Sequence, residues 1–227
     1  MWRLDACLEG IRGNPPNALQ QNLVYLMVTG MVANMSDMLY NILDEVSELR
    51  LLQYYQSQAL YNLIKRNREH LGRWMPWIDD QESEYAIYGF IRDSIGAFSQ
   101  GEQLPLTIWH QNTLAGMVGL YEIKPHHRKA QIGYWLGAEF QGNGLATMSI
   151  RALLVHAFTE LWLNRVEILV ADHNTRSRAV PERLGFKLEG MLRRAFIVRE
   201  DVQDLAVYGM TQHDWMEFQG SLVDPMS

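Results

Sequence analysis

The chain has 227 residues, of which 48% are hydrophobic and 20% are charged. This length and composition exclude a disordered or fibrous chain and predict one globular domain with a sizeable core. The formal net charge is −6 and there are no long runs of like charge, which argues against nucleic-acid or membrane partners. The single cysteine, Cys7, cannot form an internal disulfide, so we expect a cytoplasmic protein.

Residues 1–37 differ from the rest of the chain. The segment GNPPNALQQ interrupts any periodic pattern, and the apolar run from Leu23 to Met35 is too short to span a bilayer. A long mixed segment precedes this run, which disfavours a signal peptide. We therefore expect residues 1–37 to be a dispensable extension, with the start of translation at Met35 or Met38, before a domain of residues 38–217 and a short tail of residues 218–227.

The first elements of the expected domain are a strand and two helices. The segment SELRLLQY, residues 47–54, suits a short strand, and residues 57–71 carry apolar side chains at helical spacing. Pro76 lies between two tryptophans in WMPW and cannot continue a helix interior. Helical spacing resumes over residues 83–98, so the sequence predicts a break between two helices.

Three strands and a crossover are expected next. Residues 104–123 predict two strands around the turn-prone Gln111-Asn112-Thr113, and residues 129–137 (KAQIGYWLG) predict a third, so these strands form an antiparallel meander. A helix follows, with its apolar face at Ile150, Leu153, Leu154, Ala157, Phe158 and Leu161. The near-continuous apolar segment NRVEILVAD, residues 164–172, is typical of a strand in parallel pairing. Strand, helix and strand therefore form a crossover unit.

The last expected elements are a short helix and two strands. The segment TRSRAVPERLG predicts a helix that ends at Gly185. Residues 186–198 and 201–215 predict the two strands. There is no internal repeat or low-complexity linker, so the pattern predicts a single α+β domain.

A glycine loop, Gln141-Gly142-Asn143-Gly144, separates the third strand of the meander from the helix that follows it. Such a loop offers free backbone N–H groups at a positive helix end, and glycines let a phosphate come close, so it suits a pyrophosphate. A plain tight turn also explains Gly-x-Gly. A Rossmann loop is disfavoured because Thr147 replaces its third glycine and Asp172 lies 28 residues after Gly144, where about 20 is expected. No lysine follows the glycines, which excludes a Walker-type loop.

The segments IGYWLGAEFQGNGLATMSIRALLVHAF and LNRVEILVADHNTRSRAVPERLGFKLEGMLRRA resemble the GNAT N-acetyltransferases, and within them the ribosomal-protein alanine acetyltransferase group. The resemblance extends from Met38 to Trp215. It implies the fold of that family, a central mixed, mostly antiparallel sheet with one parallel crossover and flanking helices. It also implies acetyl-CoA as the donor, no metal, and self-association as a homodimer.

The resemblance implies a place for each part of acetyl-CoA. The third and following strands would splay apart and leave a notch for the thioester beside the backbone of Trp135, Leu136 and Gly137. Asn174 matches a CoA-contacting asparagine, and Ser177 matches the hydroxyl that protonates the departing thiolate, a role that a hydrogen-bond donor can fill. Taken alone, both are also ordinary helix-capping residues. The pyrophosphate would be held by Gln141, Gly142, Asn143, Gly144, Leu145 and Ala146.

The sequence departs from the family at the general base. The position just before IGYW, often glutamate in the family, is Gln131, and the position after LRRA, also often acidic, is Phe196. Neither side chain can accept a proton from the amine. The open candidates, each also explained as a solvated or ion-paired side chain, are Glu122, Glu167, Glu189, His126 and His127, and water is a further alternative.

The lack of an acidic residue at the usual base positions affects which acceptor amine is expected. Deprotonation at pH 7 costs about 1 kcal/mol for an α-amine but about 4.6 kcal/mol for a lysine. We therefore predict acetylation of the N-terminal α-amine of a protein, with ribosomal proteins as the class that the resemblance implies. Two alternatives remain open: an acetyltransferase for a small amine such as a polyamine, amino sugar or antibiotic, and a catalytically silent CoA-binding module.

Several aromatic residues have two interpretations. Trp74, Met75 and Trp77 suit core or helix packing, since large aromatic side chains are usually well buried. The resemblance places the same helix break over the acceptor side of the notch, where it would form a lid or a peptide-binding wall. For Tyr134 and Trp135 on the third meander strand, core packing is the favoured expectation.

Overall fold

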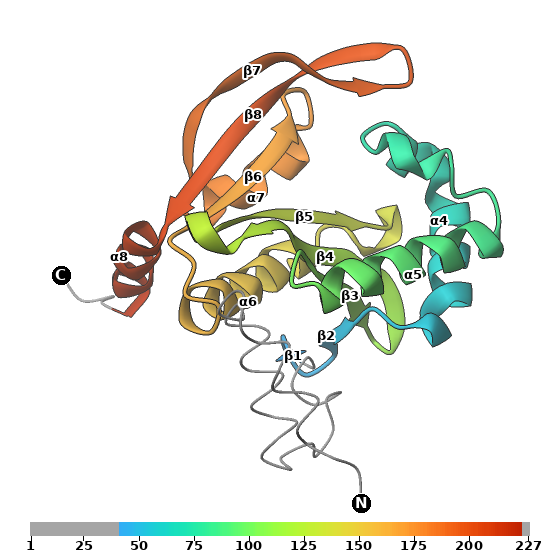
Figure 1. The fold of residues 1–227 in the computed structure, drawn as a ribbon, viewed down its shortest axis with the longest axis horizontal. Coiled ribbons are helices and arrows are strands. Elements are labelled where there is room, and N and C mark those ends of the chain that lie inside the picture. Colours follow the sequence, from blue (N-terminus) through green and yellow to red (C-terminus); the bar gives the residue numbers. More distant parts are fainter. Residues whose placement is uncertain (1–40, 224–227) are drawn as a thin grey trace, which may run out of the picture.

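The computed structural model describes residues 41–223, so the predicted extension of residues 1–37 lies outside the described residues. The strands of the described part form one sheet in the order β1-β2-β3-β4-β5-β6-β8-β7 (Figure 1). Neighbouring strands are antiparallel except for β5 and β6, which confirms the predicted mixed sheet with a parallel crossover. The strands are β1 (Asn41–Ile42), β2 (Ser47–Leu51), β3 (Leu104–His110), β4 (Thr113–Lys124), β5 (Lys129–Leu136), β6 (Arg165–Ala171), β7 (Lys187–Val198) and β8 (Asp201–Thr211).

Helices cover both faces of the sheet. They are α4 (Ser57–Gly72), α5 (Glu84–Ser99), α6 (Leu145–Thr159), α7 (Thr175–Arg183) and α8 (Gln212–Val223), with 3-10 turns η2 (Tyr54–Gln56), η3 (Pro76–Ile78), η4 (Pro125–His127) and η5 (Ala138–Phe140). Pro76 begins η3 between α4 and α5, which confirms the predicted helix break. No described helix is long and apolar enough to cross a membrane.

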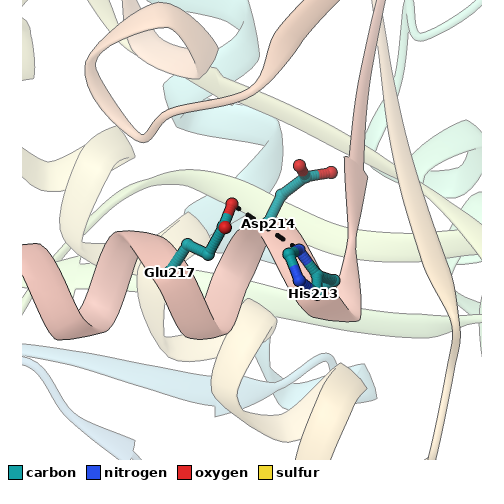
Figure 2. A group of neighbouring side chains, drawn as sticks. All are labelled: His213, Asp214 and Glu217. Carbon is teal, nitrogen blue, oxygen red and sulfur yellow. Dashed lines mark ion pairs between the residues drawn. The ribbon is translucent and has the colours of Figure 1, made fainter.

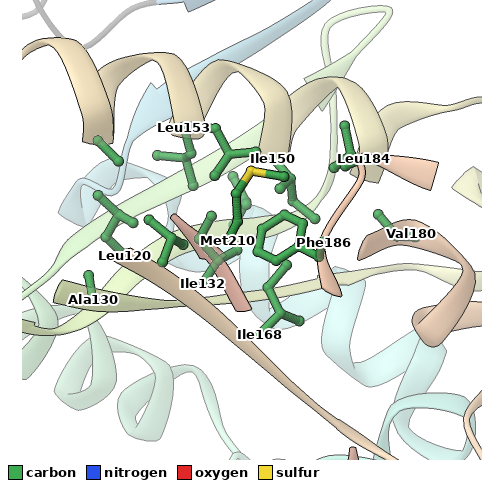
Figure 3. Close-up of a cluster of buried hydrophobic side chains, with 14 of the residues drawn as sticks. Leu120, Ala130, Ile132, Ile150, Leu153, Ile168, Val180, Leu184, Phe186 and Met210 are labelled. Atoms are coloured by element: carbon green, nitrogen blue, oxygen red, sulfur yellow. The ribbon is translucent and has the colours of Figure 1, made fainter. Parts of the chain in front are cut away.

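Two apolar cores hold the helices against the sheet. On one face, Ile150 and Leu153 of α6 are buried with Ile132, Ile168 and Met210 of the strands beneath (Figure 3). Each such side chain contributes about 1.5–3 kcal/mol when it is fully buried. On the opposite face, α4 and α5 bury their apolar positions against β4, through Leu114 and Met117. Neighbouring residues of β4 belong to different cores because successive side chains of a strand point to opposite faces.

β5 and β6 diverge after a short stretch of pairing. Their ladder contains three residue pairs, the last of which is Gln131 with Glu167. Beyond that pair, β5 continues to Leu136 beside β4, and β6 continues to Ala171 beside β8. The divergence agrees with the splay that the resemblance implied, and we refer to the unpaired gap between the two strands as the notch.

The prediction for the last strand is wrong at its C-terminal end. We expected residues 201–215 to be extended, but β8 ends at Thr211 and residues 212–223 form α8. Asp214 stops the strand, because its carboxylate accepts hydrogen bonds from the backbone N–H (3.0 Å) and the hydroxyl (2.6 Å) of Thr211. Trp215 then packs inward, with its ring centroid 6.3 Å from that of Phe158. Helix α8 runs across residue 217, the expected end of the domain.

The β7–β8 hairpin extends well beyond its neighbour β6. The pairing of β8 with β6 begins only at Leu205, opposite Ala171 at the end of β6. Residues 193–204, which we call the arm, continue past this point, and Figure 1 shows the arm reaching toward the helices on the other side of the notch. At about 3.3 Å per residue, the arm extends roughly 20 Å beyond β6.

Candidate active site

The glycine loop leads directly into α6. Gly142 and Gly144 have φ angles of 86° and 74°, in the left-handed region that favours glycine. A Cβ atom at either position would meet no other atom within 4 Å. Both glycines are therefore required by the shape of the backbone, and the space above them is open to a ligand.

The start of α6 has the properties of an anion site. Its first internal hydrogen bond runs from the Met148 N–H to the Gly144 carbonyl, at 3.0 Å. Within the described part of the chain, nothing accepts a hydrogen bond from the backbone N–H groups of residues 142–147. Free N–H groups at a helix N-terminus bind phosphates well. The predicted residues Gln141 to Ala146 thus lie together in a geometry that fits a diphosphate.

Side chains from α4 and α7 hold this loop from both sides. Arg176 Nη1 donates to Gln141 Oε1 at 2.7 Å, and Arg183 Nη1 donates to Thr147 Oγ1 at 2.9 Å. The amide nitrogen of Gln141 lies 2.9 Å from His70 Nε2. Burial, with the nearby Arg73 and Arg176, lowers the pKa of His70, so its imidazole is neutral at pH 7 and can accept this bond. Two guanidinium groups consequently lie beside the anion site.

The end of β5 is held against α4 by Asn67. This buried side chain accepts a hydrogen bond from the Ala138 N–H (2.8 Å) and donates to Glu139 Oε2 (3.0 Å) and to the Leu63 carbonyl (3.1 Å). Gly137 permits the close approach, since a Cβ atom there would lie 2.9 Å from the Leu63 side chain. The predicted notch residues therefore end in a rigid turn.

The open edge of β5 presents backbone donors to the notch. The Gly137 N–H donates to the Ala115 carbonyl at 2.9 Å, on the β4 side. Because N–H groups along a strand alternate between its two edges, those of Tyr134 and Leu136 point toward the notch. An amide N–H in that position can polarise a thioester carbonyl.

Ser177 and Tyr134 meet across the notch. Ser177 Oγ donates to Tyr134 Oη at 2.9 Å, and Tyr134 Oη donates to the Ser177 carbonyl at 2.7 Å. Burial raises the pKa of Tyr134, so its phenol is neutral. Asn174 accepts from the Ser177 N–H at 3.2 Å and is the N-cap of α7, so its helix-capping interpretation is confirmed, while its contact with CoA stays a prediction.

The glutamate candidates for the general base are engaged elsewhere. Glu167 accepts from Arg165 Nε at 2.8 Å, and Glu189 accepts from Arg165 Nη1 at 2.7 Å. The hydrogen bond from Arg165 also lowers the pKa of Glu189. Glu122 accepts from Gln131 Nε2 at 3.4 Å. These contacts surround the paired ends of β5 and β6.

The two histidine candidates lie at the other end of β5 from the notch backbone. His126 and His127 are exposed in η4, which immediately precedes β5, whereas Trp135 and Leu136 end that strand. The structure does not bring either histidine to the notch. Of the alternatives named from the sequence, water therefore stays open as the proton acceptor.

Three site features were absent from the expectations drawn from the sequence. Tyr134 packs against the core, which confirms the expectation, and its hydroxyl in addition bonds to Ser177. Strand alternation places Tyr134 on the same face as Ile132 but does not indicate the contact with Ser177. Asn67 and His70 lie about 70 residues before their partners on the loop, and no local pattern indicates contacts of that separation.

A group of possible metal ligands on α8 has another explanation. His213, Asp214 and Glu217 lie close together, but Figure 2 shows the carboxylate of Asp214 directed away from the other two side chains. Hydrogen bonds from Lys187 and Thr211 lower the pKa of Asp214 to about 2, and His213 pairs with Glu217 at 3.5 Å. Asp214 thus belongs to the start of α8, and His213 and Glu217 form an exposed pair along that helix.

Comparison with known proteins agrees with the fold and the site. Residues 48–187 match the family described as "Acetyltransferase (GNAT) domain". The chain is 35% identical over 173 residues to "Putative ribosomal N-acetyltransferase YdaF" of Bacillus subtilis (strain 168), covering 76% of this chain and 94% of the relative. It is 30% identical over 159 residues to the spermidine N(1)-acetyltransferase of Vibrio cholerae serotype O1 (strain ATCC 39315 / El Tor Inaba N16961), covering 69% and 88%.

The fold is also similar to that of a solved acetyltransferase structure. RimL, a ribosomal L7/L12 alpha-N-protein acetyltransferase in complex with coenzyme A, superposes with a TM-score of 0.74 at 28% identity, covering 76% of this chain and 97% of that one. The glycine loop, the notch and the hydroxyl pair are the parts of the fold that suit a CoA thioester. The chain belongs to the GNAT acetyltransferase family and is an acetyl-CoA-dependent N-acetyltransferase.

Proposed function

We propose that the protein acetylates the N-terminal α-amine of another protein, with a ribosomal protein as the acceptor. The observation that carries the proposal is that none of the five candidate bases named from the sequence is free at the notch, since each glutamate candidate is hydrogen-bonded and both candidate histidines lie at the far end of β5. An α-amine needs about 1 kcal/mol to lose its proton at pH 7, against about 4.6 kcal/mol for a lysine. The site therefore favours α-amines.

Each part of the site has a separate role in the proposed reaction. Loop residues 142–147 and the two arginines hold the diphosphate of acetyl-CoA, and the thioester lies against the open edge of β5. The Leu136 N–H polarises the carbonyl, the amine attacks it, and a C–N bond forms as the C–S bond breaks. The Ser177–Tyr134 pair gives a proton to the departing thiolate, and it regains that proton through water from the amine.

The ribosomal acceptor is supported by the names of two similar proteins. YdaF and RimL are both named for ribosomal substrates. A ribosomal acceptor would place the reaction in the cytoplasm. The similarity to a spermidine acetyltransferase, which extends over 159 residues, favours a polyamine acceptor as a second candidate.

The experiment is a measurement of CoA thiol release from acetyl-CoA by the full chain. The acceptors are peptides with free Ala or Ser N-termini, the same peptides with blocked N-termini, and spermidine. Release that requires the free N-terminus supports the proposal, and mass spectrometry should place the acetyl group on the α-nitrogen. Release with spermidine but not with peptides would replace the proposal by the second candidate.

A further inference from the structure

The strands that border the notch are joined on the acceptor side by a chain of contacts. The ring of Trp135 on β5 lies edge-on to that of Trp77 in η3, with centroids 6.3 Å apart. Two residues after Trp77, Asp79 forms a bidentate ion pair with Arg199 at the tip of the arm, with N–O distances of 2.9 Å and 3.0 Å. The arm leads back to β6 through the pairing of Leu205 with Ala171.

These contacts close a ring around the notch. The circuit runs from β5 through η3 and the ion pair to the arm, then to β6, and returns to β5 where Gln131 pairs with Glu167. Trp135 lies on the face of β5 that packs with α4 and α5, opposite the face of Tyr134 and Ser177. The ring therefore borders the notch on the Trp135 face.

The ion pair is the weakest link of the ring. The side chains of Asp79 and Arg199 are 43% and 54% exposed, and exposed ion pairs contribute little to stability because water and salt screen them. The other links are strand pairing and aromatic packing. Gly72 leaves room for the pair, because a Cβ atom there would lie 2.7 Å from Arg199 Nη2.

We propose that the Asp79–Arg199 ion pair is a gate that selects acceptors by width. With the gate closed, a narrow chain end passes through the ring and reaches the thioester. A wider acceptor requires the pair to open and the arm to move away from η3. The inference rests on the proposed function, since it assigns to the notch an acceptor that arrives as the end of a chain.

The test compares two acceptors with the same N-terminal residues. One is a free peptide, and the other is that peptide joined without a linker to a folded domain. We expect the wild-type chain to prefer the free peptide in kcat/KM by roughly tenfold, the range in which binding-site shape discriminates. Asp79→Asn and Arg199→Gln should each bring the ratio toward one, mainly by raising kcat/KM for the wide acceptor.

Two further variants separate the gate from a general effect of charge. The exchange Asp79→Arg with Arg199→Asp should restore the wild-type ratio, and Gly72→Ala should lower the ratio without a change of charge. Arg92→Gln is the matched control, because Arg92 pairs with Asp93 on the exposed side of α5. An equal ratio in the wild type, both single variants and Gly72→Ala would overturn the proposal.

Hydrogen exchange gives a readout that does not depend on the acceptor. Backbone amides of residues 196–202 should exchange faster in Asp79→Asn than in the wild type, and no faster in Arg92→Gln. If the wild-type chain acetylates small amines but no peptide, the proposed function fails. The gate is then judged separately by the ratio between linear spermidine and a wider amino sugar, and an unchanged ratio in Asp79→Asn would overturn it.

Discussion

The two faces of the notch differ in how strongly the contacts beside them are shielded from water. On the α6–α7 face, Ser177 and Tyr134 form two hydrogen bonds at the end of elements that are packed into the larger core. On the face of α4 and α5, Asp79 and Arg199 join a turn and a hairpin tip through an exposed ion pair. Under the proposed function and the proposed gate, donor chemistry is preorganised in the rigid part of the fold, whereas access of the acceptor depends on an exposed contact that water can open.

The largest effect that would sharpen this comparison is expected at the hydroxyl pair. Removal of the proton donor in Ser177→Ala or Tyr134→Phe should lower kcat by about 100-fold, the usual scale of general acid catalysis. The double variant should lose little more than either single variant because the two groups act together. Steady-state kinetics with saturating acetyl-CoA checks both statements, and independent, multiplicative losses would contradict a shared role.

The next effect is expected at the glycine loop. Gly144→Val places a β-branched residue at a φ of 74°, which costs about 1–2 kcal/mol and should weaken acetyl-CoA binding by about tenfold. Titration calorimetry measures the affinity. Gly89→Ala is the control, since Gly89 lies within α5 and a Cβ atom added there would meet no other atom within 4 Å. This variant should leave binding unchanged, and equal weakening in both variants would argue against the loop as the anion site.

A smaller effect is expected where α4 holds the end of β5. Asn67→Ala removes the hydrogen bonds of a buried side chain to the Ala138 N–H, Glu139 and the Leu63 carbonyl, so the free energy of unfolding should fall by about 0.5–1.5 kcal/mol. Urea unfolding measures the loss. Asn62→Ala, on the exposed side of the same helix, is the control, and an equal loss there would mean that helix propensity alone explains the result.

The smallest effect is expected in the pH dependence of stability. The pKa of His70 is lowered from its ordinary value of 6.5 by burial, so the unfolded chain binds more protons than the folded chain as the pH falls below 6.5. Stability should therefore be complete above pH 6.5 and decrease as the pH falls toward the lowered pKa. His70→Gln should show a shallower decrease between pH 7.5 and 5.5 in urea unfolding, and an identical slope would remove His70 as its source.

Much of the fold could be predicted because local periodicity reports burial. The apolar face of α6 follows from the spacing of Ile150, Leu153 and their successors. Strand β6 follows from the near-continuous apolar segment of residues 164–172. The end of β8 was missed although Gln212, His213 and Asp214 are three consecutive polar residues that interrupt the strand alternation. The Thr211-x-x-Asp214 spacing, a helix-start signal, was also present in the sequence.

The candidate site also contains residues that could be predicted from the sequence and residues that could not. The loop residues 141–146 and the Asn174–Ser177 segment could be predicted because each is contiguous in the sequence and carries a motif, and their contacts with CoA stay predictions. Tyr134, Asn67, His70 and the Asp79–Arg199 pair were not found, because each contact joins residues from about 40 to 120 positions apart. Contacts of this kind depend on the packing of whole elements.

The same sequence separation bears on the order of folding. The Asp79–Arg199 contact closes a loop of 120 residues, and the entropy lost in closing a long loop must be recovered by contacts formed earlier. An exposed ion pair recovers little of it, so we expect this contact to form after the sheet and α6 have assembled. A chain on its way to the native state would then acquire its nucleotide-binding loop first and the selective entrance last.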